Sequence, residues 1–331
     1  MIPARTAWLF PGHGSQYPGM GREVLEASAT AREIFRAAEE LSELPVRRVM
    51  LRGPAQRLSQ PALLEPALTA LSLAHAALLA EHGLAPDWVA GYSAGEVAAL
   101  HAAGVLSRAD ALRLAVLRGR ILERAAAGAA VRMVALCGIP SHQVEALVRS
   151  LESRGPIAIA GWNAEDHTTI TGAVEVVCEA ERSARALGAV ASVVEVAGVW
   201  HSPALADAAS EAWDCSREIE FGPPRVPLYV GASGRPESDP DRIRLCVARQ
   251  ICQPVLWRQV VEGLLRRGCT RFYELGPGGV LSSFLKRRRG GAPELDVQCV
   301  ERRGGTLRAL DRRGGAACTR HGRPVPIPSY N

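Results

Sequence analysis

A serine between two glycines is the strongest candidate for chemistry in this sequence. Residues 91–95 read Gly-Tyr-Ser-Ala-Gly, after a short apolar run and directly before an alanine-rich helical pattern. A strand that turns this sharply into a helix needs small residues two positions before and after the serine, whose hydroxyl is then exposed at a helix N-terminus. The free N–H groups there favour a developing oxyanion. In this context we interpret Ser93 as a nucleophile, although the motif alone is equally consistent with a turn.

A nucleophilic serine needs a general base, and histidine is the side chain most often used for that role. Of the eight histidines we retain His13, His167 and His201, because the others lie in helical stretches, near a helix start or in the C-terminal tail. Ser202 and Pro203 suit an N-cap and a first helical position, which places His201 where a strand passes into a helix. Chemistry in α/β folds is commonly placed at such junctions, so His201 is preferred. For each histidine the plain alternative is a polar loop side chain.

A glycine-rich loop and one arginine are further candidates. Residues 11–21 follow a short strand expected at 7–10 and can bring backbone N–H groups close to a reacting carbonyl. A dinucleotide-binding Gly-x-Gly-x-x-Gly is excluded because Tyr17 stands at its third glycine. Arg118 has only apolar neighbours on its face of a predicted helix, so it points inward. It is either a structural ion pair with a buried carboxylate or a bidentate receptor for a substrate carboxylate.

The order of the expected elements indicates an α/β fold with two parts. Short strands that lead through glycine-containing turns into helices are typical of an open α/β sheet, and the turn at Ser93 is that of an α/β-hydrolase. From about residue 131 to 196 the order is strand, helix, strand, strand, helix, strand, which is the ferredoxin-like pattern. The predicted units are an α/β-hydrolase-like core (1–128 and 199–290), an inserted ferredoxin-like subdomain (129–198), and an Arg/Gly-rich, poorly ordered tail (291–331) with a possible edge strand at 296–300.

The composition is that of an ordinary globular protein, with 47% hydrophobic and 22% charged residues among 331. We find no apolar run of membrane-spanning length and no signal peptide, and the eight cysteines are scattered, which favours reduced thiols. We therefore expect a cytoplasmic monomer without a metal site or membrane association. Basic residues alternate with acidic ones, so nucleic-acid binding is not expected, while the net charge of +5 suits an acidic partner.

Six segments occur in an order and spacing shared with one known family: residues 10–16, 91–96, 118–119, 163–172, 201–203 and 274–278. They resemble motifs of the malonyl-CoA:acyl-carrier-protein transacylases of fatty-acid and polyketide synthesis, and the resemblance covers about residues 8–286. Phe-Pro-Gly-His-Gly-Ser-Gln at 10–16 is similar to the family's Phe-Pro-Gly-Gln-Gly-Ser-Gln. Gly-Tyr-Ser-Ala-Gly-Glu at 91–96 is similar to its Gly-His-Ser-x-Gly-Glu.

The resemblance implies a role for each candidate residue. It makes Ser93 the nucleophile and His201 the base, oriented by a main-chain carbonyl at about Gln250. It also implies that Trp200 occupies the position that senses the group on the α-carbon of the substrate. The candidate site residues are Ser93, His201 and Gln250 for catalysis, the N–H groups of His13 and Ala94 for the oxyanion hole, and Arg118, Trp200 and Asn163 for substrate binding.

The implied reaction transfers a malonyl or related carboxyacyl group from CoA to the phosphopantetheine thiol of an acyl carrier protein, through an acyl-serine and without a bound cofactor. Alternatives are a hydrolase that clears acyl groups from carriers, a transferase for an unusual acyl group, and an inactive docking module. Arg118 argues against the hydrolase, because editing of monofunctional acids needs no carboxylate receptor. Three single residues, His13, Glu65 and Tyr92, and the sequence Gly-Val-Trp-His at 198–201 depart from the family's pattern; Glu65 replaces a usual glutamine. These departures leave the reaction type intact and make the acyl group the open question.

Overall fold

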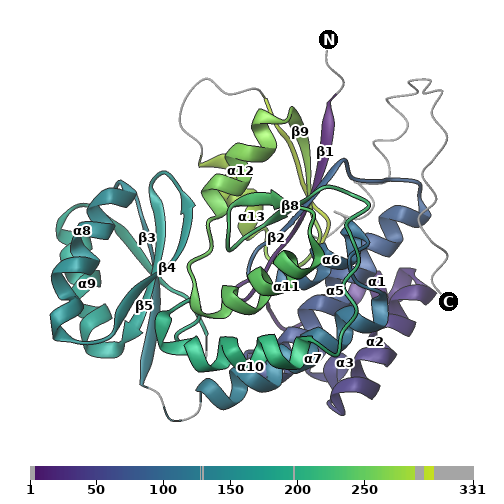
Figure 1. Cartoon of the computed structure of the whole chain (residues 1–331), viewed down its shortest axis with the longest axis horizontal. Coiled ribbons are helices and arrows are strands. Elements are labelled where there is room, and N and C mark those ends of the chain that lie inside the picture. The colour runs from purple at the N-terminus through teal and green to yellow at the C-terminus, as the bar shows by residue number, and fades with distance from the viewer. Residues whose placement is uncertain (1–3, 127, 129, 197, 288–293, 302–331) are drawn as a thin grey trace.

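Two β-sheets form the framework of the chain (Figure 1). The structure is a computed structural model, and it describes residues 4–126, 128, 130–196, 198–287 and 294–301. In spatial order the larger sheet consists of β10 (Asp296–Cys299), β9 (Cys269–Glu274), β1 (Arg5–Phe10), β2 (Trp88–Gly91), β7 (Leu228–Val230) and β8 (Arg235–Glu237). The smaller sheet consists of β4 (Ile157–Ala164), β5 (His167–Ala173), β3 (Val131–Cys137) and β6 (Val190–Val193). The α/β class predicted from the sequence is confirmed.

The register of the larger sheet brings the chemical segments together. Strand β1 lies between β2 and β9 and is parallel to both, with Phe10 beside Gly91 and Leu9 beside Glu274. The carboxyl ends of parallel strands meet at one edge, so the loop after β1 and the turn after β2 leave the sheet side by side. The edge strand expected at 296–300 is confirmed as β10, which is parallel to β9. The other residues of the predicted tail, 291–293 and 302–331, lie outside the described residues.

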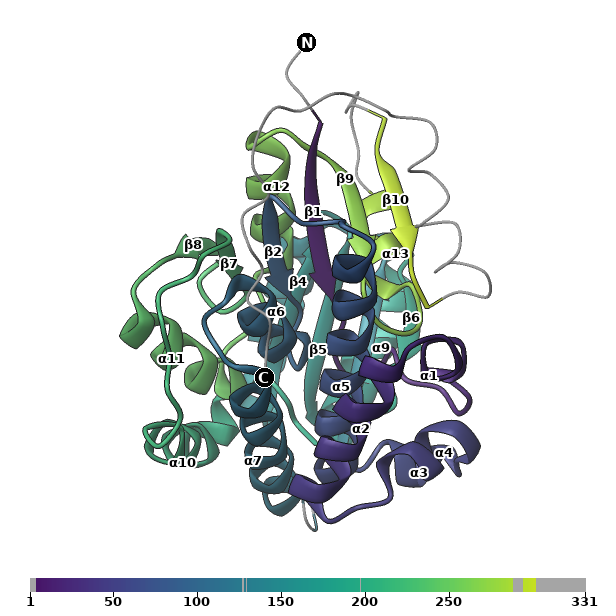
Figure 2. The same ribbon diagram turned by 90° about the vertical axis from the view of Figure 1, so that its right-hand side faces the viewer.

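Helices cover both faces of the larger sheet, and Figure 2 shows α2, α5 and α7 side by side next to it. The helices of this part are α1 (Arg22–Ala27), α2 (Ala29–Ser42), α3 (Val46–Arg52), α4 (Ala55–Leu58), α5 (Pro61–Glu81), α6 (Gly95–Ala103), α7 (Arg108–Ala126), α10 (Ala206–Ser216), α11 (Pro240–Arg249), α12 (Trp257–Arg266) and α13 (Val280–Lys286), with 3₁₀ turns η2 (Pro203–Leu205) and η3 (Gln250–Cys252). Gly119 lets α7 approach α5 closely, because a Cβ atom there would lie 2.7 Å from the Pro61 carbonyl oxygen.

Helix α5 corrects one expectation, namely that no apolar run reaches membrane-spanning length. With 21 residues and a mean hydropathy of 1.5 in its most apolar window, it is long and apolar enough to cross a membrane. However, 89% of that window is buried inside the protein. Helices α2 and α7 both pack against it, so its uniform apolar surface is that of a core helix.

The helical patterns at about residues 23–42 form two helices, α1 and α2. They are separate because the Ser28 side chain caps α2, accepting a hydrogen bond from the Ala31 N–H at 3.1 Å. The polar stretch expected next contains α3 and α4, whose apolar residues, among them Val49 and Leu58, are buried. These helices are too short for their periodicity to stand out in the sequence. Strand β7, with three residues, was not predicted for the same reason.

The smaller sheet has the predicted ferredoxin-like order. Its strands are antiparallel, and α8 (Ser141–Leu151) and α9 (Val174–Ala186), with the 3₁₀ turn η1 (Glu152–Arg154), cover its outer face (Figure 1). Side chains alternate along β3, so Val134 and Leu136 pack in the core with these helices while Met133 and Ala135 face a cavity on the other side. One face of this sheet is therefore structural, and the other forms a wall of the cavity.

The residue after the last described strand reaches back to the N-terminal loop. The Glu301 carboxylate lies 3.0 Å from His75 Nε2 of α5, accepts a hydrogen bond from the Gly21 N–H, and accepts another from the Tyr17 hydroxyl at 3.3 Å. Glu301 thereby links β10 to the loop at 11–21 and to the core helix.

Candidate active site

The sharp turn predicted at Ser93 connects β2 to α6. Ser93 has a backbone φ of 54°, a left-handed conformation that is unfavourable for a residue other than glycine. A Cβ atom at Gly91 would lie 2.2 Å from Glu96 Cα, and one at Gly95 would lie 2.0 Å from the Phe10 carbonyl oxygen. Neither position has room for a side chain, which is the packing reason for both glycines.

The loop after β1 lies against this turn. A Cβ atom at Gly12 would lie 2.4 Å from the Tyr92 carbonyl oxygen and 3.2 Å from the Ala94 nitrogen. Across the described part of the chain, no backbone hydrogen bond uses the N–H group of His13 or of Ala94. Ala94 is also the N-cap of α6, where N–H groups point away from the helix. This arrangement places two donors where they can bind the oxygen of a tetrahedral intermediate.

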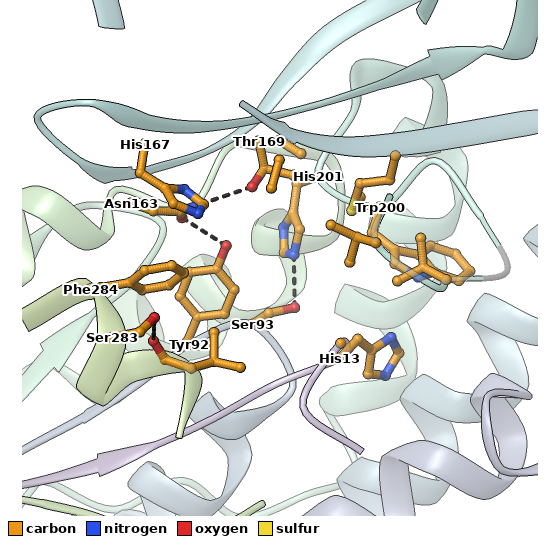
Figure 3. Close-up of a pocket in the computed structure, with 17 residues that line it drawn as sticks. His13, Tyr92, Ser93, Asn163, His167, Thr169, Trp200, His201, Ser283 and Phe284 are labelled. Carbon is orange, nitrogen blue, oxygen red and sulfur yellow. Dashed lines mark hydrogen bonds between the residues drawn. The ribbon is translucent and has the colours of Figure 1, made fainter. Parts of the chain in front are cut away.

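His201 forms a hydrogen-bonded pair with the serine (Figure 3). Its Nε2 atom lies 2.7 Å from Ser93 Oγ. Its Nδ1 atom lies 2.7 Å from the main-chain oxygen of Gln250 and 3.2 Å from that of Gln253. Carbonyl oxygens only accept, so Nδ1 carries the proton and the lone pair of Nε2 faces the serine hydroxyl. Burial lowers the pKa of His201 to about 4, so the imidazole is neutral and can accept a proton at neutral pH.

The position of His201 differs in detail from the prediction of a strand-to-helix junction. Strand β6 ends at Val193, where its pairing with β3 ends, and the chain then crosses to the larger subdomain. His201 lies in a turn with a φ of 63°, and its N–H donates to the Ile251 carbonyl at 2.9 Å. The predicted cap is present, because the Ser202 side chain accepts from the Ala204 N–H, but it opens the 3₁₀ turn η2 rather than an α-helix.

Backbone strain is concentrated at Ser93 and His201. Among the described residues other than glycine, only Glu43, Ser93 and His201 have a positive φ. Glu43 is the C-cap of α2, a usual place for this conformation. The other two are held by their surroundings in a conformation that costs about 1–3 kcal/mol each.

Gln250 connects the histidine to two buried charged residues. Its side-chain amide donates to the Glu96 carboxylate, and its Oε1 atom accepts from Arg118 Nη2 at 3.4 Å. Glu96, in the first turn of α6, also accepts from the Gly231 N–H at 3.1 Å, and burial raises the pKa of Glu96 to about 8. Gln250 therefore orients His201 through its main chain while its side chain is fixed on both sides.

Arg118 points inward from α7, as predicted, and its side chain is 3% exposed. Its Nη1 atom donates to the Val247 carbonyl at 3.2 Å, and its Nε atom lies 3.5 Å from Glu65 Oε2. The other oxygen of Glu65 lies 3.2 Å from His13 Nε2. Burial alone would raise the pKa of Glu65, but the Arg118 guanidinium and His13 hold it below its usual value. The buried carboxylate considered as a partner for Arg118 is therefore present, at a distance that leaves the contact weak.

A second polar group lies on the other side of Ser93, as Figure 3 shows. The Tyr92 hydroxyl donates to Asn163 Oδ1 at 2.9 Å, and Asn163 Nδ2 donates to Thr169 Oγ1 at 2.8 Å and lies 3.0 Å from His167 Nδ1. Burial raises the pKa of Tyr92 and lowers the pKa of His167 to about 4, so this network is uncharged at neutral pH. The Phe284 ring packs edge-on against His167, with 4.8 Å between ring centroids.

A cavity of about 190 Å³ lies over the Ser93–His201 pair and between the two subdomains. The predicted site residues that line it are His13, Ser93, Asn163, Trp200 and His201. Those that lie behind its wall are Ala94, Arg118 and Gln250, which reach the pair through backbone groups or through other side chains. The structure thus brings all eight together around one nucleophile. In the described ranges, no cluster of three or more His, Cys, Asp or Glu side chains could hold a metal ion.

Trp200 forms one end of the cavity and is 4% exposed. Its ring lies edge-on to His13, with 6.1 Å between centroids. A Cβ atom at Gly198 would lie 2.4 Å from the indole, so the space beside this glycine is already filled by the ring. The indole therefore occupies this end of the cavity, and Gly198 offers no further space beside it.

Sequence reasoning did not assign a role to several residues of the site. Glu65, which pairs with Arg118 across 53 residues, was visible only as a departure from the family's pattern. His167 was kept only as one candidate general base, and Thr169 only as part of a predicted strand. Glu96 carried a signal, because an acidic residue directly after the elbow glycine stands in the first turn of a buried helix. Its burial on an apolar helix face could have marked it.

Comparisons with known proteins agree with this geometry. Over residues 7–291 the sequence matches the acyl transferase domain family. It is 30% identical over 286 residues to the malonyl CoA-acyl carrier protein transacylase of Bacillus subtilis, covering 86% of this chain and 90% of the relative. The fold is similar to the crystal structure of malonyl-CoA:acyl carrier protein transacylase from Xanthomonas oryzae, with a TM-score of 0.87, 30% identity, and coverage of 94% and 99%. The fold is also similar to a chain in the structure of a type II polyketide-synthase acyl carrier protein in complex with its malonyl-transacylase. The TM-score is 0.87 at 28% identity, and the match covers 93% of this chain and 100% of that one.

The elbow serine, its histidine and the matched domain define an acyltransferase. Within this class the chain belongs to the family of malonyl-CoA:acyl-carrier-protein transacylases, as the motifs along the sequence predicted.

Proposed function

We propose that this acyltransferase moves a malonyl group from CoA to the phosphopantetheine thiol of an acyl carrier protein, with Ser93 as the acyl-carrying residue. The observation that carries the proposal is the 2.7 Å contact between Ser93 Oγ and His201 Nε2, with Nδ1 held by the Gln250 carbonyl. A neutral, oriented imidazole beside a serine at a helix N-terminus is suited to nucleophilic catalysis.

In the first half-reaction, Ser93 Oγ attacks the thioester carbonyl of malonyl-CoA while His201 Nε2 takes the hydroxyl proton. The carbonyl oxygen becomes an oxyanion, which the N–H groups of His13 and Ala94 stabilise. The carbon–sulfur bond then breaks, and the CoA thiolate leaves with the proton from His201. The product is a malonyl ester of Ser93, and the histidine is neutral again.

In the second half-reaction, the phosphopantetheine thiol of the carrier replaces CoA. His201 removes the thiol proton as the sulfur attacks the acyl-serine carbonyl, and the same two N–H groups bind the oxyanion. Collapse of the intermediate releases Ser93, whose oxygen takes the proton back from His201. The histidine thus acts first as a base and then as an acid in each half, without a net change of protonation.

For the acyl group, we assign the substrate carboxylate to Arg118, the bulk limit at the α-carbon to Trp200, and a hydrogen bond near the thioester to Asn163. The guanidinium makes only long contacts, of 3.2–3.5 Å, so it can turn toward an incoming carboxylate. Trp200 narrows the cavity and favours malonyl over a branched methylmalonyl group. The reaction uses Ser93 and His201 as its reacting protein groups, and we place it in the cytoplasm.

The test is to incubate the enzyme with labelled malonyl-CoA, with and without a phosphopantetheinylated carrier protein. Intact-mass analysis should show one malonyl group on the enzyme, absent in Ser93→Ala, and the label should move to the carrier when it is added. In competition, malonyl-CoA should outcompete methylmalonyl-CoA. If the label is released as free malonate and does not appear on the carrier, the protein is the editing hydrolase instead. No adduct, or an equal adduct in Ser93→Ala, would refute the serine assignment.

A further inference from the structure

Three buried side chains that can carry charge form a row beside the nucleophile. His13 lines the cavity, its Nε2 atom lies 3.2 Å from Glu65 Oε1, and Glu65 Oε2 lies 3.5 Å from Arg118 Nε. The three side chains are 7%, 1% and 3% exposed, in that order. The row therefore runs from the cavity wall into the protein with almost no contact with water.

The charge balance of this row differs between possible acyl groups. With His13 neutral, the positive charge of Arg118 and the negative charge of Glu65 compensate each other. A malonyl group brings a second carboxylate into the same enclosed space, which would leave an uncompensated negative charge. An acetyl group brings none. A site that favours malonyl therefore needs either the loss of one negative charge or the gain of a proton.

Among the described residues, contact geometry leaves His13 and Glu65 as the pair that can take up this proton. The titratable groups that face the row are Glu65 on α5, Arg118 on α7, Glu96 on α6, His201 in the turn before η2, and His13 itself. A guanidinium has no site for a further proton, and burial lowers the pKa of His201 to about 4, so this imidazole stays neutral. Burial raises the pKa of Glu96 to about 8, so below this pH it is mostly protonated and accepts no further proton.

We propose that His13 and Glu65 act as a proton-accepting pair that determines selectivity, taking up one proton from solvent when a carboxylated acyl group enters beside Arg118. The proton neutralises the extra carboxylate, so that the occupied site again has equal numbers of positive and negative charges. Because the pair is coupled, the proton belongs to both residues rather than to one of them. This inference rests on the proposed malonyl transfer and extends it to the way in which the pocket recognises charge.

The expected signature is a pH-dependent preference between two substrates. The ratio of kcat/KM for malonyl-CoA to kcat/KM for acetyl-CoA should fall as the pH rises from 5.5 to 7.5, by up to about tenfold per pH unit, because one proton is bound with malonyl and none with acetyl. His201 and the CoA moiety serve both substrates, so their ionisation cancels in the ratio.

Two substitutions should shift this ratio in opposite directions. Glu65→Gln removes the negative charge, so the ratio at pH 7.5 should rise by about tenfold and lose its pH dependence. His13→Gln breaks the pair and leaves the negative charge of Glu65 in place, so the ratio should be low and flat between pH 5.5 and 7.5. The control is His142→Gln, which changes an exposed histidine on α8 and should behave as the wild type.

The outcomes separate this inference from the proposed function. A wild-type ratio that is constant between pH 5.5 and 7.5, or a shift in the same direction in both variants, overturns the inference. Thermal melts identify a variant that does not fold. If Glu65→Gln does not fold, the inference is tested by His13→Gln alone, for which a low and flat ratio of the two kcat/KM values is expected. If wild-type Ser93 accepts neither acyl group, the proposed function itself is wrong. If it accepts malonyl with no pH-dependent selectivity, only the proton-accepting pair is wrong.

Discussion

The two sides of the Ser93–His201 pair hold their polar groups in different ways. On the side of Tyr92 the groups are uncharged and make hydrogen bonds of 2.8–3.0 Å. On the other side lie the charged groups Arg118 and Glu65, whose contacts with each other, with His13, with Gln250 and with the Val247 carbonyl are 3.2–3.5 Å long. Short, fully made hydrogen bonds fix the wall of a cavity, whereas long contacts to a guanidinium are easily exchanged for a better acceptor. We infer that the first side positions a substrate part common to all acyl donors, and that the second distinguishes between acyl groups.

The largest effect should come from the residue between the two sides. His201→Ala removes the general base, so acylation of Ser93 should slow by about 10²–10⁴-fold with malonyl-CoA and acetyl-CoA alike. Rapid-quench intact-mass analysis gives both rates. A loss that is confined to one donor would mean that His201 belongs to one side rather than to both.

On the charged side, Arg118→Ala should reduce the preference for malonyl over acetyl by about ten- to a hundredfold, since a charge-assisted hydrogen-bonded pair is worth about 1.5–3 kcal/mol. Acylation by acetyl-CoA should be much less affected. The measurement is kcat/KM for each donor, with a melting curve to show that the variant is folded. Equal losses for both donors would show that Arg118 is only a structural ion pair.

On the uncharged side, Tyr92→Phe removes one hydroxyl and its hydrogen bond to Asn163 while keeping the ring. A neutral hydrogen bond contributes about 0.5–1.5 kcal/mol, so kcat/KM should fall by about two- to tenfold for malonyl and acetyl donors equally. The unchanged ratio is the informative result. If the preference for malonyl over acetyl changes instead, the uncharged side also distinguishes between acyl groups, contrary to our inference.

The smallest effect expected is the response of the acetyl reaction to pH. His201 must be neutral to act as a base, and its pKa is lowered to about 4, so the active form is present above that value and is lost as the pH falls through it. Acylation by acetyl-CoA should therefore change by less than about twofold between pH 5.5 and 7.5. A steep rise near pH 6.5 in stopped-flow or quench data would contradict the lowered pKa.

Local sequence was enough to single out Ser93 and His201, whose side chains the structure places 2.7 Å apart. The glycines at 91 and 95 predict the elbow, and a Cβ atom at Gly91 would collide with the turn while one at Gly95 would collide with the end of β1. The inward direction of Arg118 followed from helical periodicity alone. Its partner did not, because Glu65 meets it only when α5 and α7 pack together at Gly119. Contacts of this kind depend on tertiary structure, which one sequence does not reveal.

The network around Asn163 shows the same limit. Its partners lie on neighbouring strands of the smaller sheet and on the elbow, so they meet only once the two sheets face each other. The short elements α3, α4 and β7 were not predicted for a different reason. A helix of one or two turns, or a strand of three residues, has too few positions to show a period.

The contacts of Glu301 with the loop at 11–21 and with α5 bear on the order in which parts of the site can form during synthesis. Strand β1 is synthesised first, yet it needs β9 beside it, and Ser93 needs a histidine that follows 108 residues later. At roughly 5–20 residues per second, a ribosome needs about 5–20 s to cover that distance. The loop that carries the His13 N–H is then secured by a carboxylate near residue 300. The Ser93–His201 pair and the loop beside it can therefore be complete only after residue 301 has been made.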